Sequence, residues 1–179
     1  MIKLKESKEN IIKKAEELGT DYEAIYKGCA QCTFLAIIDA LRWGGLELMS
    51  VEMEEKLYPA ISVLTAGVCM TAEGTCGAVN SGVMALGLAM GVSKDNPDIA
   101  ATRNAAATIR NSFLEKIFRE YHSILCKDVQ RKYFGKAWNL ADDEMAHEFL
   151  GITRGCIIMD TAKLAAKHIL DEYERGNAK

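Results

Sequence analysis

Apolar residues recur at helical spacing along almost the whole chain, whereas alternation with the two-residue period of a β-strand is hard to find. The N-terminal segment shows the pattern first. We expect its helix to end at Gly19, because glycine commonly follows the last turn of a helix. The apolar face of that helix carries Ile11, Ile12, Ala15 and Leu18. Runs of β-branched residues are also short, so the pattern predicts an all-α fold.

Glycine, proline and capping residues divide the rest of the chain into further helices. These are expected over 21–43, opened by Asp21 and stopped by Gly44-Gly45; from Ser50 onward, with Pro59 near the first turns; over 75–90, ended by Gly91; from Asn96-Pro97 to Tyr133, bending at His122-Ser123; and over 153–174. We expect a break at 66–74 and a loop with one short helix over 137–151. No linker or internal repeat is visible, so the prediction is a single helical domain over residues 1–179 with about six helices.

The stretch 57–93 is long and apolar, with Glu73 as its single charged residue. Its length would suit a membrane span, but polar residues interrupt its middle and no aromatic belt flanks it. We therefore predict a buried helix pair rather than membrane insertion. Small residues follow one another one helical turn apart, at Gly74, Ala78, Gly82, Ala85 and Ala89. This ridge predicts that the glycine- and alanine-rich helix 75–90 lies at the centre of the bundle, either through tight packing alone or beside a cofactor or cysteine cluster.

Composition and charge narrow the function classes. The chain has 179 residues, of which 49% are hydrophobic and 26% charged, and its net charge is −3. Without a basic stripe, nucleic-acid binding is disfavoured. The N-terminal segment 1–19 is charged throughout and lacks the apolar core of a signal peptide, so we expect a cytoplasmic protein. Six cysteines there favour reduced thiols, metal ligands or redox chemistry over a disulfide scaffold.

Two features of the cysteines suggest a sulfur site. Cys29 and Cys32 form a C-x-x-C unit in a predicted helix, where both sulfurs would share one face and could bind one metal or form a disulfide. Cys76 and Cys156 lie at predicted helix starts, the latter three residues after the possible N-cap Thr153. Free N–H groups and the helix dipole lower the pKa of a thiol in that position. A buried cysteine that only fills the core is the alternative for each of them.

From this we expect Cys76 to be the most nucleophilic thiol of the reduced, metal-free protein. Thr75 would cap its helix, and Cys69 in the preceding connector would be its nearby disulfide partner. Glu73 is expected to cap the same helix start rather than to tune the thiols.

The histidines give weaker evidence for a metal site than the cysteines do. Cys126 follows His122 by four residues, one helical turn, which would suit a pair of metal ligands. We expect His122 to be a surface or core-edge residue instead, and His147 and His168 to be structural or solvated. The chain contains no hydrolase nucleophile motif, P-loop or dinucleotide-binding glycine pattern.

The sequence around four of the cysteines resembles a redox-active protein family that is named for its cysteine pattern, C_GCAxxG_C_C. The likeness spans about residues 20–170 and is carried by Cys29 in GCAQ, Cys76 in CGAVNSG, Cys126 in ILCKDV and Cys156 in GCIIMD. The CGAxxG-like element is one residue longer before its second glycine, Gly82. The resemblance implies a small helical protein whose four cysteines are redox-active or bind a metal, and it favours Cys29 as the partner of Cys76. The additional Cys32 and Cys69 depart from it.

Three functions therefore compete. In the first, Cys76 and Cys29 are catalytic in thiol–disulfide exchange or relay electrons to a redox partner protein, with or without enzymatic turnover. In the second, a zinc ion or an iron–sulfur cluster is held by Cys29, Cys76, Cys126 and Cys156, with Cys32 and Cys69 as additional ligands. The third is a helical interaction protein with structural cysteines. All three are compatible with a homo-oligomer.

Overall fold

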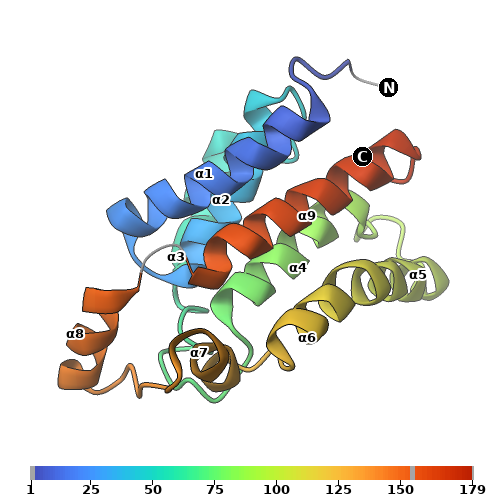
Figure 1. Cartoon of the computed structure of the whole chain (residues 1–179). Helices are drawn as coiled ribbons and strands as arrows, with labels where there is room; N and C mark the ends of the chain where they lie inside the picture. Colours follow the sequence, from blue (N-terminus) through green and yellow to red (C-terminus); the bar gives the residue numbers. More distant parts are fainter. Residues whose placement is uncertain (1–2, 154–155, 179) are drawn as a thin grey trace.

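The computed structural model of the protein describes residues 3–153 and 156–178, and these residues form helices joined by turns, with no β-strand among them (Figure 1). The helices are α1 (Lys8–Tyr26), α2 (Cys29–Trp43), α3 (Val51–Ser62), α4 (Gly77–Met90), α5 (Ile99–Ile109), a π-helical turn η1 (Arg110–Leu114), α6 (Glu115–Tyr121), α7 (Cys126–Phe134), α8 (Asp143–Ile152) and α9 (Cys156–Glu174). The all-α prediction is confirmed, although the described chain is divided into more helices than the six expected. None of the described helices is long and apolar enough to cross a lipid bilayer.

Four helices share the core. α1, α2, α4 and α9 run side by side, and α2 packs against each of the other three (Figure 1). α5 and α6 lie along the outer side of α4, while α7 and α8 lie at one end of the molecule. Close packing between α4 and its neighbours depends on small residues: a Cβ added to Gly82 would lie 2.4 Å from Cζ of Phe113 in η1. The small-residue ridge of α4 therefore faces its neighbours.

The boundary between the first two helices differs from the prediction. α1 continues through Gly19 to Tyr26, so Gly19 does not stop the helix and Asp21 does not open the next one. A Cβ added to Gly19 would lie 3.2 Å from Cα of Met159 in α9, which shows that this glycine permits a close approach between helices. The chain turns instead at Lys27 and Gly28, whose φ angles are 54° and 87°. As a result Cys29 is the first residue of α2.

Other boundaries follow local signals. Ser50 caps α3 by accepting a hydrogen bond from the backbone N–H of Met53 at 3.3 Å, but Pro59 lies in the third turn rather than near the first. The helix expected to bend at residues 122–123 is broken there, because His122 has a left-handed conformation and α7 starts at Cys126. Thr153 ends α8 rather than capping α9.

The predicted break before α4 is an unusual turn. Five consecutive residues, 66–70, have φ angles between 51° and 70°, and only one of them is glycine. Left-handed backbone costs about 1–2 kcal/mol for each residue that carries a Cβ. Such strain persists where the surrounding structure fixes the chain, and it is often found beside functional sites.

A short antiparallel bridge fixes the end of this turn. Thr75 and Leu125 are bridged, the N–H of Cys76 donates to the carbonyl of Ile124 at 2.8 Å, and the N–H of Cys126 donates to the carbonyl of Gly74 at 2.9 Å. Cys76 follows Thr75 and Cys126 follows Leu125. Because successive side chains in an extended pair alternate between its two faces, these two cysteines lie diagonally opposite each other on the same face. The starts of α4 and α7, each with a cysteine, are therefore held together.

Candidate thiol site

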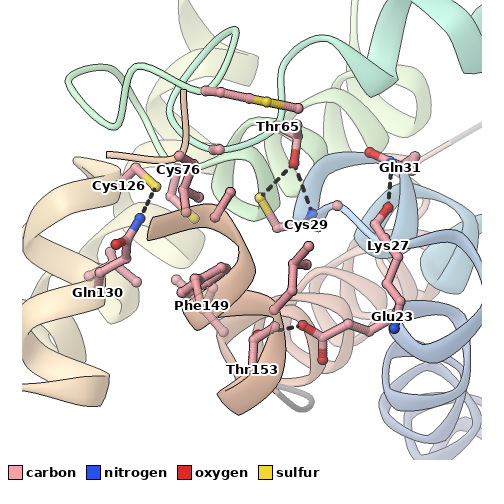
Figure 2. Close-up of a pocket in the computed structure, with 18 of the residues that line it drawn as sticks. Glu23, Lys27, Cys29, Gln31, Thr65, Cys76, Cys126, Gln130, Phe149 and Thr153 are labelled. Carbon is pink, nitrogen blue, oxygen red and sulfur yellow. Dashed lines mark hydrogen bonds between the residues drawn. The ribbon is translucent and has the colours of Figure 1, made fainter. Parts of the chain in front are cut away.

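Three cysteines from separate helices lie together. Figure 2 shows Cys76 between Cys126 and Cys29 at the wall of one pocket. Each stands at a helix start: Cys29 is the first residue of α2, Cys76 is the N-cap of α4 and Cys126 is the first residue of α7. Cys76 and Cys126 are buried, whereas Cys29 is partly exposed. We call these three residues the thiol triad.

Two glycines leave the space that the side chains of Cys29 and Cys126 occupy. A Cβ added to Gly77 would lie 2.7 Å from Sγ of Cys29, so the sulfur occupies the space that any other side chain would need. A Cβ added to Gly67 would lie 2.6 Å from Cβ of Cys126. Both contacts are below the ordinary van der Waals range for carbon and sulfur. The glycine that follows Cys76 in the sequence is thus required by a different cysteine.

Hydrogen bonds set the acidity of Cys29. The thiol of Cys76 donates to it and is the largest influence that lowers the pKa of Cys29 from 9.0 to about 6, against the opposing effect of burial. The hydroxyl of Thr65, 3.4 Å from the sulfur, and the backbone N–H groups of Ala66 and Ala78 lower it further. Ala78 is the second residue of α4, so the N-terminus of that helix stabilises the thiolate of Cys29.

Cys76 is the proton donor of the triad. Its hydrogen bonds to Cys126 and to Cys29, together with burial, raise the pKa of Cys76 well above its ordinary value. A thiol carries one proton, so Cys76 can donate to only one neighbour at a time. The prediction that Cys76 would have the lowered pKa is therefore wrong. Its backbone N–H is already bonded to Ile124, its side chain makes no cap hydrogen bond, and the helix start acts on the neighbouring sulfur instead.

Cys126 has a second donor. The hydrogen bond from Cys76 lowers its pKa most, burial and the charge of Cys29 oppose this, and the side-chain amide of Gln130 lowers it further. The amide nitrogen of Gln130 lies 3.2 Å from Sγ of Cys126. The amide oxygen accepts from the backbone N–H of Trp138 at 2.8 Å, which fixes which end of the amide faces the sulfur.

Sequence reasoning missed Thr65 and Gln130. Gln130 follows Cys126 by four residues on one helix, a spacing that predicts contact once the start of α7 is known. Thr65 reaches Cys29 only through the tertiary fold, and its hydroxyl also accepts from the backbone N–H of Cys29 at 3.1 Å. No local sequence pattern predicts the contact between Thr65 and Cys29.

The remaining cysteines are placed differently. The thiol of Cys32 is buried and donates to the backbone carbonyl of Tyr22 at 3.2 Å. Cys69 is exposed and lines the pocket from the left-handed turn. Cys156 begins α9, but its side chain lies outside the described residues. Within the described ranges, no group of three or more His, Cys, Asp or Glu side chains is arranged to hold a metal ion.

The histidines and Glu73 stand apart from the triad. His122 is exposed at the end of α6 and does not share a helical face with Cys126, so the geometry assumed for a ligand pair is absent. His147 is exposed and His168 is buried in α9. Glu73 does not cap α4; it forms an ion pair with Lys127.

A cavity of about 960 Å³ opens over the thiol triad. Its walls come from the end of α1, the start of α2, the end of α3 with the left-handed turn, and from α7 and α8. Figure 2 shows Gln31, Lys27 and Glu23 on one side of this space, with Thr153 below them. Thr153 donates a hydrogen bond to the carboxylate of Glu23 at 2.7 Å. The thiols are therefore reachable by a molecule that enters the cavity.

One comparison with known proteins finds a relation. A family model described as "Putative redox-active protein (C_GCAxxG_C_C)" matches residues 27–168. No curated protein and no solved structure is similar to the chain at a level that shows homology. The matched span is most of the chain and contains the thiol triad and Cys156, the cysteines that carried the resemblance. The chain therefore belongs to the C_GCAxxG_C_C family.

Proposed function

We propose that the protein is a thiol–disulfide redox protein in which Cys29 is the attacking thiolate and Cys76 is the resolving thiol. The observation that carries the proposal is that Cys29 has a pKa lowered to about 6, hydrogen-bonds to a second thiol, and lines an open cavity. A thiolate, not a thiol, is the nucleophile in this chemistry. Cys29 meets that requirement at neutral pH.

The reaction balances with a disulfide as the co-reactant. The Cys29 thiolate attacks one sulfur of the disulfide, the bond between the two substrate sulfurs breaks, and one half leaves as a thiolate. The sulfur of Cys76 then attacks Cys29, the mixed disulfide breaks, and the second half leaves. The Cys29 thiolate and the Cys76 thiol are oxidised to one disulfide, and the substrate disulfide is reduced by two electrons to two thiols. One of the two protons that the departing halves take up derives from Cys76, and solvent supplies the other.

The pKa of Cys76 should fall when the second step begins. Once Cys29 is in a mixed disulfide it carries no charge, so one cause of the raised pKa of Cys76 is gone. Cys126 is the neighbouring sulfur with a lowered pKa, and it already accepts a hydrogen bond from Cys76. We assign Cys126 the role of accepting the proton of Cys76 as that thiol attacks.

A metal centre is the second candidate, because three cysteines from three helices meet and Cys156 begins a fourth. Zinc would need four sulfurs at about 2.3 Å in a tetrahedral array. Cys29, Cys76 and Cys126 are three of the four sulfurs that such a site needs, and Cys156 would be the fourth. A metal ion would displace the proton that Cys76 donates to its neighbours.

Anaerobic purification tests both candidates on one sample. Metal content is measured first, and the reduced protein is then equilibrated with glutathione redox buffers, trapped by alkylation and mapped by mass spectrometry. We expect one two-electron oxidation that joins Cys29 to Cys76. Cys29→Ser should abolish it and Cys76→Ser should accumulate a mixed disulfide on Cys29.

Cys32→Ser is the matched control, because the Cys32 thiol is buried against a backbone carbonyl and should leave the couple unchanged. One equivalent of bound zinc or iron with thiols that do not titrate would support the metal centre instead. Thiols that neither bind metal nor oxidise would leave only the interaction protein.

A further inference from the structure

The cavity over the thiol triad is larger than disulfide exchange with a protein surface requires. Such exchange needs an accessible sulfur, whereas this hollow measures about 960 Å³. Sites for organic ligands and cofactors commonly measure about 300–1,000 Å³. The volume therefore lies within the range of sites that bind organic molecules.

The cavity is lined by aromatic rings at the end formed by α7 and α8. Tyr133 and Phe134 of α7 have ring centroids 4.9 Å apart, and Phe149 of α8 meets Phe134 edge-on at 5.6 Å. All three rings line the cavity. Edge-to-face arrangements of this kind leave ring faces and edges that attract another ring.

The mouth of the cavity is apolar as well. Five large hydrophobic side chains both line it and are exposed by 44–55%. They are Tyr26, Val63, Met70, Tyr133 and Leu150. Singly scattered exposed apolar residues need no explanation, but several around one opening mark a binding site.

The charges in the described cavity lining are of mixed sign rather than a cluster of one sign. Among the described residues that line the cavity, the charged groups are the carboxylate of Glu23, the ammonium group of Lys27 and, at neutral pH, the thiolate of Cys29. Glu23 is engaged by Thr153. Gln130, the amide nearest the triad, already uses its amide nitrogen toward Cys126 and its oxygen toward Trp138. A neutral molecule is the best complement to such a lining.

We propose that this cavity binds a neutral, ring-containing organic molecule, with its rings against Tyr133, Phe134 and Phe149 and its reactive group against Cys29. The proposal names the substrate class for the proposed thiol chemistry and rests on it for the reaction, although binding itself does not. In the exchange described above, the preferred substrate is a disulfide that carries aromatic groups. Glutathione disulfide, which is polar and charged, is disfavoured.

Binding is tested with the fluorescent probe phenylnaphthylamine on the reduced protein and on Cys29→Ser. We expect saturable binding at one site, equal for the two proteins. Leu150→Asp, at the mouth, should weaken binding about tenfold, because it places a charge where the ligand would cover an apolar side chain. Phe118→Asp is the matched control, since Phe118 is 45% exposed on α6 and does not line the cavity; it should bind as the parent does.

Reactivity is tested with dithiodipyridine, which is neutral and aromatic, and with bis(hydroxyethyl) disulfide, which is small and aliphatic. Each rate with Cys29 is divided by the rate with free N-acetylcysteine. We expect the normalised rate for the aromatic disulfide to be about tenfold higher, and the advantage to disappear in Leu150→Asp but not in Phe118→Asp.

The outcomes separate the two proposals. Saturable binding with a Cys29 that reacts with neither disulfide would uphold the cavity assignment and defeat the redox function. Exchange at equal normalised rates, with no saturable probe binding, would uphold the redox function and overturn the cavity assignment. Equal weakening by Leu150→Asp and Phe118→Asp would also overturn it.

Discussion

Single hydrogen bonds between thiols control the acidity of this site. The donors that lower the pKa of Cys29 are the thiol of Cys76, the hydroxyl of Thr65 and two backbone N–H groups. A hydrogen bond to a charged acceptor contributes about 1.5–3 kcal/mol, which is comparable to one or two pKa units. The chemistry of Cys29 should therefore follow the state of its neighbour.

Replacing Cys76 tests this dependence. Cys76→Ala removes the donor and should raise the pKa of Cys29 from about 6 by one unit or more, whereas Cys76→Ser keeps a donor and should shift it less. The rate of alkylation of Cys29 as a function of pH, followed by peptide mass spectrometry, measures both. Equal shifts in the two variants would show that the donated hydrogen bond is not what lowers the pKa.

At the scale of elements, the glycines of α4 differ in what surrounds them. Gly77 leaves space for the sulfur of Cys29, and Gly82 leaves space for the ring of Phe113. A Cβ on Gly87 would meet no atom within 4 Å. The first two glycines are fixed by packing, while the third has only the conformational cost of glycine within a helix.

These differences predict opposite effects of one substitution. Gly82→Ala should lower the free energy of unfolding by about 1–3 kcal/mol, because its Cβ would lie 2.4 Å from Cζ of Phe113 and 3.0 Å from Cγ2 of Thr161. Gly87→Ala should raise it by about 0.5–1 kcal/mol. Urea unfolding of the reduced proteins measures both. A destabilised Gly87→Ala, or an unchanged Gly82→Ala, would contradict the packing of α4.

Helix boundaries set by local chemistry were predictable from the sequence. Ser50 and Gly91 lie where the caps and glycines place them. Gly19 was misjudged because its neighbour, Met159, comes from the other end of the chain. That error assigned the last turns of α1 to the next helix and hid the position of Cys29 at a helix start. The candidate cysteines could be named from the sequence, but which thiol becomes acidic depends on contacts among three helices.

At the scale of the whole molecule, α9 carries a buried histidine at a junction of elements. His168 lies near Ser112 of η1 and Lys116 of α6, with Lys167 and Asp171 on its own helix. Burial, then the charges of Lys116 and Lys167, lower the pKa of His168 from 6.5 to about 4, against the opposing effect of Asp171. The fold therefore favours the neutral imidazole.

Acid should lower the free energy of unfolding through His168. Since the folded pKa lies below the unfolded one, the stabilisation is present above pH 6.5 and is lost as the pH falls toward 4. We expect the loss of unfolding free energy between these values to be about 2 kcal/mol smaller in His168→Gln. Denaturant unfolding at both pH values measures it. His147→Gln, at an exposed histidine, is the control and should match the parent; a parent-like His168→Gln would refute the assignment.

The bridge between Thr75 and Leu125 has a consequence for biosynthesis. A nascent chain that has emerged only as far as α4 already carries Cys29 and Cys76, but it lacks the segment whose carbonyl at Ile124 accepts from the N–H of Cys76. The left-handed turn before α4 then has no partner to hold it, and backbone of that kind relaxes when it is unsupported. Ribosome-bound intermediates should therefore carry thiols of ordinary acidity. We expect the acidic thiol of Cys29 to form only after translation has passed α7.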